Sequence, residues 1–358
     1  MMNTSQKLIA LLSGAALLSV STLAAQTATT DPVGYVTVGL LAGSDTYVTL
    51  PLAAAANSSG ALDSSPVVTG TVSATLAYNG GWTNDEFAGS HFVRITSGAR
   101  NGRYYSISSN TETALTIGLD GDDFAGVTTG DTFGVFKYST LADVFPVGNS
   151  AIYQSSGNLS FQRETEVLLP DLETEGVNLA ASNVFFLKST GWVEATAGFP
   201  AADNVVIRPE TYIVIRHPSD VSDSELVITG TVETKDVTVQ LNTSASGSQD
   251  NFVSVPRPVG LSLNDLNLLQ SGVFVASAGN LSFQRKDEVL LFDNSTAATN
   301  KAPSRIFFAV GSDWKEATAG FPIVTNDAIL SSSGASLIVR KKATASGETA
   351  FWPNSATY

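Results

Sequence analysis

The chain contains the same sequence twice, and this repeat limits its fold more than any other feature. The heptapeptide Gly-Asn-Leu-Ser-Phe-Gln-Arg occupies residues 157–163 and returns unchanged at 279–285. A second heptapeptide, Glu-Ala-Thr-Ala-Gly-Phe-Pro, occupies 194–200 and returns at 316–322, at the same spacing of 122 residues. Because each copy must form a unit of the same kind, the repeat predicts two similar units in tandem. It predicts an architecture and leaves the activity open.

The residues around the repeated peptides have the pattern of short strands. Runs such as 166–169 and 212–216 are rich in Val, Ile and Leu and are bounded by turn residues. In 158–162 apolar and polar residues alternate, which predicts a half-buried strand with Leu159 and Phe161 facing the core. We therefore expect an all-β protein of two tandem duplicated β units.

Each unit is expected to begin with a hairpin and to contain one short helix. Val-Thr-Val runs at 36–38 and 237–239 each lead through a loop to a second apolar run that a proline ends, which predicts a hairpin. Thr140 and Ser262 each stand three residues before an aspartate. This is a capping-box pattern, and it predicts one short helix in each unit.

Only the first unit carries an insertion, at 65–138. Five strand-like runs and an Asn-Gly turn at 101–102 lie within it, which predicts a small five-stranded β-barrel. The expected divisions are a signal peptide (1–24), the hairpin of unit 1 (25–64), the inserted barrel (65–138), the repeat block of unit 1 (139–220), the hairpin of unit 2 (221–261), the repeat block of unit 2 (262–345) and a C-terminal tail (346–358).

The first 24 residues have the features of an export signal. Lys7 precedes a short apolar run at 8–18, and small residues follow as far as Ala24. This run is too short to span a bilayer, and the later sequence has no apolar run of the ~18 residues that a spanning helix needs. We therefore expect an exported protein with no membrane span, located in the periplasm, on the outer surface or outside the cell.

The amino-acid composition limits the chemistry that the protein can perform and the partners that it can bind. The chain has no cysteine, which excludes disulfides, thiolate metal sites and cysteine nucleophiles. Its net charge is −14 with only 15% charged residues, and such an acidic surface repels nucleic acid and anionic lipid. The partners that we expect are a glycan or another envelope protein.

Short motifs spread along the whole chain resemble those of one known group. They are DPVGY at 31–35, FVRITSG at 92–98, ISSNT at 107–111, GDTF at 130–133 and IVR at 338–340. Together they resemble an uncharacterised paralogous family of exported proteins from Verrucomicrobia-type bacteria. The resemblance implies export and a β-rich fold. It implies no activity, because that family has no assigned chemistry.

The sequence contains no catalytic motif that we recognise. Its two histidines, His91 and His217, lie in separate predicted strands, and Lys341 holds the position of His217 in the second copy. Nucleophile-elbow, zinc-protease and phosphate-loop motifs do not occur. We therefore expect a non-enzymatic envelope, surface or matrix protein, adhesive or glycan-binding.

The alternative is an exported polysaccharide hydrolase with carboxylates at the junction of the two units. Glycoside hydrolysis needs two carboxyl groups roughly 5–9 Å apart, and pseudo-symmetric placement could bring a pair together. Four glutamates recur in the two copies and are the candidates: Glu166, Glu288, Glu194 and Glu316.

The repeated tryptophans Trp192 and Trp314 are the candidate ligand site. An exposed indole can stack on a sugar ring while neighbouring amides bond the sugar hydroxyls. The candidate amides are Asn158, Gln162, Asn280 and Gln284. In the alternative interpretation each tryptophan packs across a hairpin and supplies core area.

An acidic turn is the candidate metal site. Asp120, Asp122 and Asp123 stand close together with Asp131 nearby, and such oxygen ligands can hold Ca²⁺ weakly. No other cofactor is expected, and the alternative is a solvated turn. Arg94, Arg100 and Arg103 form an arginine cluster in the same insertion. They could meet an acidic partner or pair internally.

Overall fold

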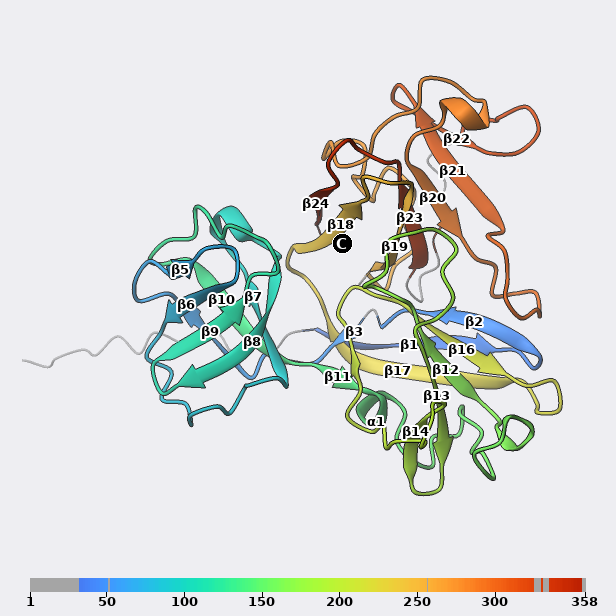
Figure 1. Cartoon of the computed structure of the whole chain (residues 1–358), viewed down its shortest axis with the longest axis horizontal. Helices are drawn as coiled ribbons and strands as arrows, with labels where there is room; N and C mark the ends of the chain where they lie inside the picture. Colours follow the sequence, from blue (N-terminus) through green and yellow to red (C-terminus); the bar gives the residue numbers. More distant parts are fainter. Residues whose placement is uncertain (1–31, 51, 256, 325–329, 331–334, 356–358) are drawn as a thin grey trace, which may run out of the picture. The chain divides into compact units, whose positions relative to one another are not determined.

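The computed structural model describes residues 32–50, 52–255, 257–324, 330 and 335–355. The expected signal peptide at 1–24 lies outside the described residues. Strands dominate the described chain, and its one α-helix is the four-residue α1 (Leu141–Val144), so the protein is all-β as expected (Figure 1). In this described part no helix has the length and apolar composition needed to cross a membrane.

Each repeat unit contains an antiparallel sheet of five strands, four from its repeat block and one from the segment before it. The first has the order β14-β13-β12-β16-β2 and the second the order β22-β21-β20-β23-β19. The strands of the first are β2 (Ser44–Val48), β12 (Glu166–Leu169), β13 (Asn183–Lys188), β14 (Gly191–Glu194) and β16 (Ile213–His217). Those of the second are β19 (Gln249–Val255), β20 (Glu288–Leu291), β21 (Arg305–Val310), β22 (Asp313–Glu316) and β23 (Ala335–Lys341).

The two sheets agree in register as well as in strand order. Val167 lies opposite Phe185 on one neighbouring strand and Ile215 on the other. At the matching place in the second sheet, Val289 lies opposite Phe307 and Val339. The two copies of the sequence repeat thus have the same local topology. That one segment of the gene was copied stays a prediction.

The predicted hairpins are wrong. The first strand of each unit pairs with a late strand: β1 (Val33–Leu40) with β17 (Ser224–Val232), and β18 (Val237–Thr243) with β24 (Glu348–Asn354). β17 was expected in the hairpin of unit 2 and β24 in the C-terminal tail, but they bury residues in the cores of the first and second unit. The second strand of each, β2 or β19, joins the five-stranded sheet. Both layers bury apolar residues in one core, because Val36 and Val38 belong to the same cluster as Ile215. To cover the core from both sides, the chain passes from one layer to the other between β1 and β2, and again between β18 and β19, so these strands do not pair.

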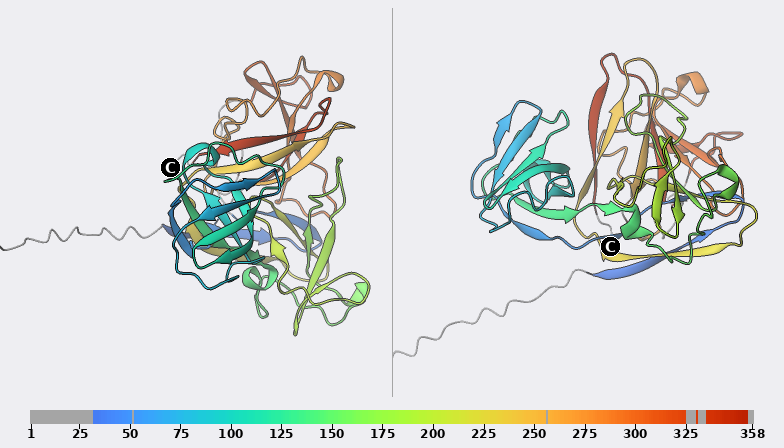
Figure 2. Two further views of the ribbon diagram at one scale, coloured as in Figure 1. Left: turned by 60° about the vertical axis from the view of Figure 1, so that its left-hand side comes forward. Right: turned by 60° about the horizontal axis from the view of Figure 1, so that its bottom comes forward.

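The insertion at 65–138 and the strand just before it, residues 58–61, form a curled seven-stranded sheet in place of the expected five-stranded barrel. Its order is β4-β10-β7-β8-β9-β6-β5, and Figure 2 shows how the sheet curls. Its own apolar cluster includes Val93, Ile107 and Val135. Among the described residues no ladder joins the edge strands β4 and β5. One backbone bond lies near this gap: the N–H of Asp63, just after β4, donates to the carbonyl of Ala77 at the end of β6. The strands are β4 (Ser58–Ala61), β5 (Val67–Thr69), β6 (Ser73–Ala77), β7 (His91–Ile95), β8 (Tyr104–Thr111), β9 (Ala114–Gly118) and β10 (Thr132–Lys137).

Several short elements complete the described chain. β3 (Leu52–Ala53) extends the sheet of β1 and β17, and β11 (Ser139–Thr140) pairs with β15 (Val206–Ile207). Thr140 caps α1 through the expected capping box with Asp143. The second expected helix is absent from the described residues after Ser262. The Asp265 N–H does donate to Ser262 Oγ, but Asn267 adopts a left-handed backbone (φ 57°), which ends a right-handed helix.

The repeated heptapeptide is a turn and not the strand that its alternation predicts. Residues 160–162 and 282–284 form the 3₁₀ turns η2 and η3. Leu159 and Phe161 are exposed instead of facing the core. The Gln162 side chain accepts the Leu159 N–H, and such a side-chain bond to the backbone competes with strand pairing.

A fourth apolar cluster joins the outer faces of the two five-stranded sheets. It contains Tyr212, Leu290 and Ile338, with Tyr47 and Phe292 packed against them. The rings of Tyr47 and Phe292 stack with their centroids 3.9 Å apart. The two sheets therefore pack against each other through an aromatic contact.

Candidate functional site

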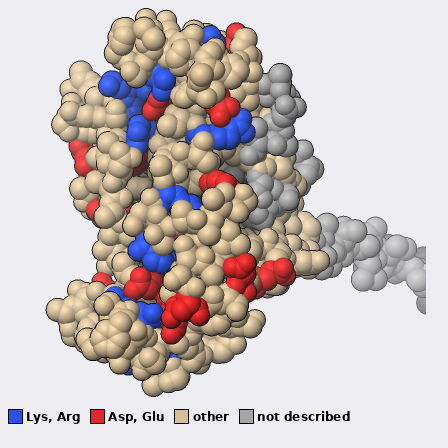
Figure 3. Space-filling model, turned by 90° about the vertical axis from the view of Figure 1, so that its right-hand side faces the viewer, with Lys and Arg blue, Asp and Glu red and all other residues tan. Residues whose placement is uncertain are grey.

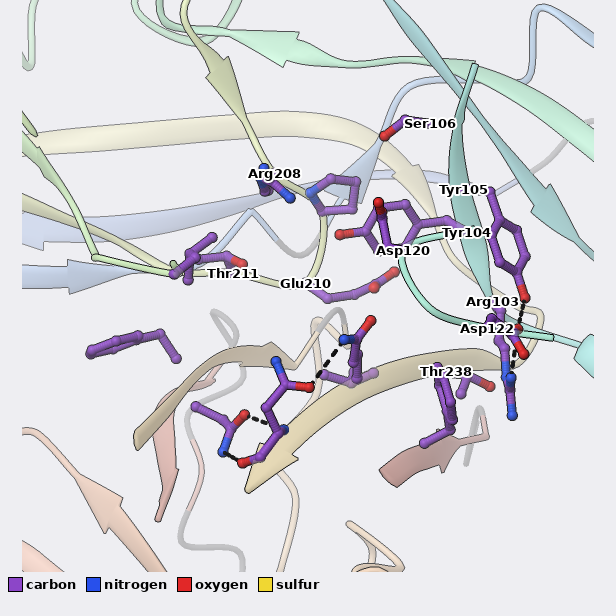
Figure 4. Close-up of a pocket in the computed structure, with 18 of the residues that line it drawn as sticks. Arg103, Tyr104, Tyr105, Ser106, Asp120, Asp122, Arg208, Glu210, Thr211 and Thr238 are labelled. Carbon is purple, nitrogen blue, oxygen red and sulfur yellow. Dashed lines mark hydrogen bonds and ion pairs between the residues drawn. The ribbon is translucent and has the colours of Figure 1, made fainter. Parts of the chain in front are cut away.

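A polar cavity of about 460 Å³ lies where the inserted sheet and both repeat units meet (Figure 4). The inserted sheet contributes the start of β8 and the turn at 119–122. The first unit contributes 171–173 and 208–211, and the second contributes parts of β18 and β19. This volume lies within the range of ~300–1,000 Å³ that is usual for small-molecule sites.

The segment 208–211 carries the most unusual residue of the wall. Glu210 has a left-handed backbone with φ of 60°, which a residue with a side chain seldom adopts and which costs roughly 1 kcal/mol or more. Its carbonyl accepts the Ser254 N–H at 2.8 Å, and its side chain is only 4% exposed. Tertiary contacts on both sides thus hold this strained position.

Arg94 of β7 binds two carboxylates that are far away in the sequence. One terminal nitrogen lies 2.6 Å from Glu210 Oε1, and the other lies 2.7 Å from Glu233 Oε2. Burial raises the pKa of Glu210 to about 7, even though Arg94 opposes the shift. One guanidinium shared by two carboxylates cannot fully offset the desolvation of both. The wall therefore holds a carboxyl group that titrates near neutral pH.

The opposite wall is a closed ion cluster around Asp122. Asp122 accepts hydrogen bonds from Arg100 at 3.0 Å, from Arg103 at 2.8 Å and from the Tyr105 hydroxyl at 2.5 Å. Burial alone would raise its pKa, but the bonds from Tyr105 and Arg100 outweigh burial and lower the pKa of Asp122 to about 2. This carboxylate stays ionised and already has its partners.

The predicted Ca²⁺ site is therefore wrong. Asp122 and Asp123 both bind Arg100, while Asp131 accepts the Ser97 hydroxyl and the Thr128 N–H. Arginines therefore occupy oxygens of Asp122 and Asp123, and neutral donors occupy those of Asp131. Across the residues that the structure covers, no three His, Asp or Glu side chains are grouped to hold a metal ion. Asp120 is exposed and lines the cavity instead.

The arginine cluster is paired internally, as the second interpretation expected. Arg94 binds the two glutamates described above, and Arg100 and Arg103 bind the aspartates of their own sheet. Basic and acidic side chains are also neighbours on the surface: most Lys and Arg of the face in Figure 3 lie beside Asp or Glu.

The predicted tryptophan platform is wrong as well. Trp192 is 1% exposed and Trp314 is 3% exposed. Trp192 Nε1 donates to the Phe145 carbonyl at 2.8 Å, and the Trp314 ring packs against Phe274. Large aromatic side chains supply much of the area that a small β unit can bury. Both indoles are core residues and cannot stack on a ligand.

The four candidate amides shape the repeated turns. Asn158 Oδ1 accepts a bond from Lys188, and Asn280 Oδ1 accepts one from Lys315. Gln162 and Gln284 each accept the N–H of the leucine three residues earlier. The structure therefore does not bring these amides together with the tryptophans into one binding site.

The recurring glutamates each have a local partner. Glu166, Glu288 and Glu316 bind Arg163, Arg285 and Arg305, and Glu194 accepts a bond from Asn183. These contacts are the same in kind as structural ion pairs elsewhere in the chain, so the four glutamates offer no evident catalytic pair.

Both histidines are structural neighbours of hydroxyl groups. His91 Nδ1 lies 2.8 Å from Ser90 Oγ, and His217 lies between the hydroxyls of Thr165 and Ser224. Burial lowers the pKa of His217 and the pKa of His91. Burial thus disfavours the charged form of each ring.

Comparisons with family models, curated proteins and solved structures found no match to this chain. The cavity is therefore interpreted from its own residues. Sequence reasoning missed Arg94, Glu210 and Glu233 as a group because 116 and 139 residues separate the partners. The only local signal in the sequence is an acidic residue directly after Pro209, and it is a weak one.

Proposed function

We propose that the protein is an exported, non-enzymatic envelope or matrix protein that binds a neutral saccharide in the polar cavity. The observation that carries this proposal is the lining itself, which combines hydroxyl, amide and carboxylate groups with aromatic rings. Sugars are recognised by planar polar groups that bond their hydroxyls and by rings that cover their C–H faces.

Three lining side chains have hydrogen-bonding capacity to spare. The Tyr104 hydroxyl, the Thr211 hydroxyl and the Asp120 carboxylate form no hydrogen bond or ion pair with another described residue, and Figure 4 shows all three beside the cavity. Burial raises the pKa of Tyr104, so its phenol stays protonated and can donate. Phe252 and Phe351 supply the rings.

The charges of the cavity favour an uncharged ligand. Its two cations are already paired, Arg103 with Asp122 and Arg208 with Glu173. Two lining carboxylates, Asp120 and Asp171, form no ion pair with a described residue and would repel an anion. A neutral, hydroxyl-rich molecule satisfies the free groups without a charge of its own, which is why we favour a saccharide over a phosphate or a uronic acid.

Calorimetry of the mature protein against a panel of neutral oligosaccharides tests the proposal. Tyr104→Phe and Asp120→Asn should each weaken the binding of the best ligand about tenfold, because each removes one hydrogen bond. Tyr35→Phe and Asp313→Asn are matched controls at exposed positions outside the cavity and should bind as the unaltered protein does. The proposal fails if no neutral sugar binds, or if the two cavity variants bind normally.

One observation favours a second candidate, a polysaccharide hydrolase. A buried carboxyl with a pKa of about 7, such as that of Glu210, suits a general acid. Incubation with each bound saccharide followed by mass spectrometry would reveal cleavage. Products that disappear in Glu210→Gln would establish the enzyme and overturn the non-enzymatic proposal.

Export is the third part of the proposal and has its own test. Fractionation of the source cell, with mass spectrometry of the mature N-terminus, should find the protein outside the cytoplasm and cleaved close to Ala24. An intact protein in the cytoplasm would contradict it.

A further inference from the structure

The two copies of the heptapeptide present the same apolar tip to solvent. Phe161 is 81% exposed and Phe283 is 82% exposed, and Leu159 and Leu281 beside them are about half exposed. No other phenylalanine among the described residues reaches this class of exposure. Each tip thus exposes two large apolar side chains within three residues, and exposed apolar patches mark interaction surfaces.

Each tip is held in shape by its own residues. The Gln162 N–H donates to the Leu159 carbonyl at 2.8 Å, and the Leu159 N–H donates back to Gln162 Oε1 at 3.3 Å. Gly157 permits this closure, because a Cβ there would lie 2.2 Å from Gln162 Oε1. The corresponding bonds in the second tip are 2.8 Å and 3.2 Å.

An arginine anchors each tip to the five-stranded sheet. Arg163 donates to the Asn158 carbonyl and stacks on Phe186 with its guanidinium 4.9 Å from the ring centre. Arg285 does the same with the Asn280 carbonyl and Phe308, also at 4.9 Å. A preorganised tip loses little conformational entropy when it binds, so its stiffness is consistent with a recognition element.

We propose that these twin Leu-Ser-Phe tips bind an insoluble neutral polysaccharide, each ring stacking on the C–H face of a pyranose. The tip sequence from Gly157 to Gln162 carries no charge, and Arg163 behind it is neutralised by Glu166. Two identical tips match a partner that repeats the same unit, and a polymer of one sugar does so. This surface is separate from the cavity, so the inference stands whether or not the cavity binds an oligosaccharide.

A lipid bilayer is the less favourable occupant. The chain has a net charge of −14, and bacterial membranes present anionic headgroups that repel such a protein. The two Leu-Ser-Phe tips contain no lysine or arginine, and Arg163 and Arg285 behind them are both engaged with the sheet. The exposed Lys286 beside the second tip is matched by Glu164 beside the first, so the two tips share no cation that could bind a headgroup. A neutral polysaccharide imposes no electrostatic penalty.

Co-sedimentation with microcrystalline cellulose, chitin and insoluble β-1,3-glucan tests the inference. Phe161→Ser and Phe283→Ser should each weaken retention on the preferred polymer, and the double variant should lose more than either single variant, because it removes both stacking contacts. These substitutions should leave the fold intact, because both rings are exposed and contribute little to the core. Val227→Ser, at a half-exposed position on β17, is the matched control and should be retained normally.

A second pair of variants separates ring stacking from general apolar contact. Phe161→Leu with Phe283→Leu keeps apolar area but removes the rings, so retention should fall as it does for the serine double variant. Phe161→Tyr with Phe283→Tyr should be retained. Full retention of the leucine variant, absence of retention on all three polymers, tip-dependent binding to phosphatidylcholine vesicles, or tip-dependent dimers in sedimentation velocity would each overturn the inference. Unchanged oligosaccharide binding in the serine variants would show that the cavity acts independently.

Discussion

The two repeat units place different chemistry at the same buried position. In the first unit Thr165 and His217 meet beneath the sheet, with His217 Nδ1 3.0 Å from Thr165 Oγ1. In the second unit Asp287 and Lys341 occupy these places and form an ion pair. All four side chains are at most 3% exposed. One fold therefore accepts either a neutral or a charged pair at this point in its core.

A shared backbone requirement explains why both pairs fit. Thr165 Oγ1 accepts the Tyr153 N–H at 3.0 Å, and Asp287 Oδ2 accepts the Val275 N–H at 2.8 Å. Either oxygen satisfies the backbone of the preceding loop, but only the carboxylate brings a charge that needs a cation. The residue opposite must change together with it, from histidine to lysine. The residue types at the two facing positions therefore depend on each other.

The largest expected effect comes from breaking the charged pair. Lys341→Met leaves Asp287 buried without its cation and should lower the free energy of unfolding by about 3–5 kcal/mol. Denaturant unfolding and amide hydrogen exchange in β20 and β23 would measure the loss. A cost below about 1 kcal/mol would show that solvent or another group neutralises Asp287.

Transplanting the neutral pair sharpens the same comparison. Asp287→Thr combined with Lys341→His copies the first unit into the second. It should recover most of the stability lost in Lys341→Met, because no charge remains unpaired and the Val275 N–H keeps an acceptor. If the double variant is as unstable as the single one, the two pairs of positions are not equivalent.

Tryptophan burial distinguishes the units in a second way, with a smaller expected effect. Trp192 Nε1 bonds the Phe145 carbonyl, whereas Trp314 Nε1 is buried and has no partner among the described residues. Trp192→Phe should therefore cost about 1–2 kcal/mol more than Trp314→Phe, since only the former leaves a carbonyl without its donor. Trp352→Phe is the control and should resemble Trp192→Phe, because Trp352 Nε1 bonds the Leu266 carbonyl. Equal losses at 192 and 314 would contradict this reasoning.

Strand content was predictable from the sequence, while strand partners were not. The apolar run at 166–169 coincides with β12 because β-branched and aliphatic residues suit a pleated, buried surface. Periodicity does not report which strand lies beside which, so β1 and β2 were expected to pair with each other. The observed partner of β1 begins at Ser224, too far away for any local pattern to show.

The repeated turn shows how local alternation can mislead. Residues 158–162 alternate as a strand would, yet the bond from the Leu159 N–H to Gln162 Oε1 and the missing side chain of Gly157 favour a closed turn. The tryptophans failed as site residues for a related reason, since a sequence does not state which face of a strand is covered. The cavity depends on Arg94 and Glu210, which only the tertiary fold brings together.

A pH difference between the units is the third expected effect. Burial lowers the pKa of His217, so below the ordinary value of about 6.5 the unfolded chain binds more protons than the folded chain. Stability of the first unit should therefore fall as the pH drops below about 6.5, by at most about 1.4 kcal/mol per pH unit for one proton.

Hydrogen exchange measured at pH 7 and pH 5.5 isolates this effect. Opening of β16, which carries His217, should become easier at the lower pH, and His217→Gln should remove that change. His91→Gln is the control, because His91 also has a lowered pKa but lies in the inserted sheet and should leave β16 unaffected. A pH response of β16 that survives His217→Gln would assign the titration to another group.

The smallest expected effect concerns the outer edge of each sheet. Arg305 binds Glu316 at 2.9 Å in the second unit, where the first unit has Asn183 bonding Glu194 at 2.8 Å. The arginine side chain is 39% exposed, and a partly solvated pair of this kind contributes about 0.5 kcal/mol. Arg305→Ala and Asn183→Ala should thus cost similar, small amounts at low salt. Only the cost of Arg305→Ala should shrink in 1 M NaCl, because salt screens the ion pair far more than the bond from a neutral amide. If salt reduces both costs equally, the Asn183–Glu194 bond depends on charge as strongly as the Arg305–Glu316 pair does. The expected electrostatic difference between the two sheet edges would then be absent.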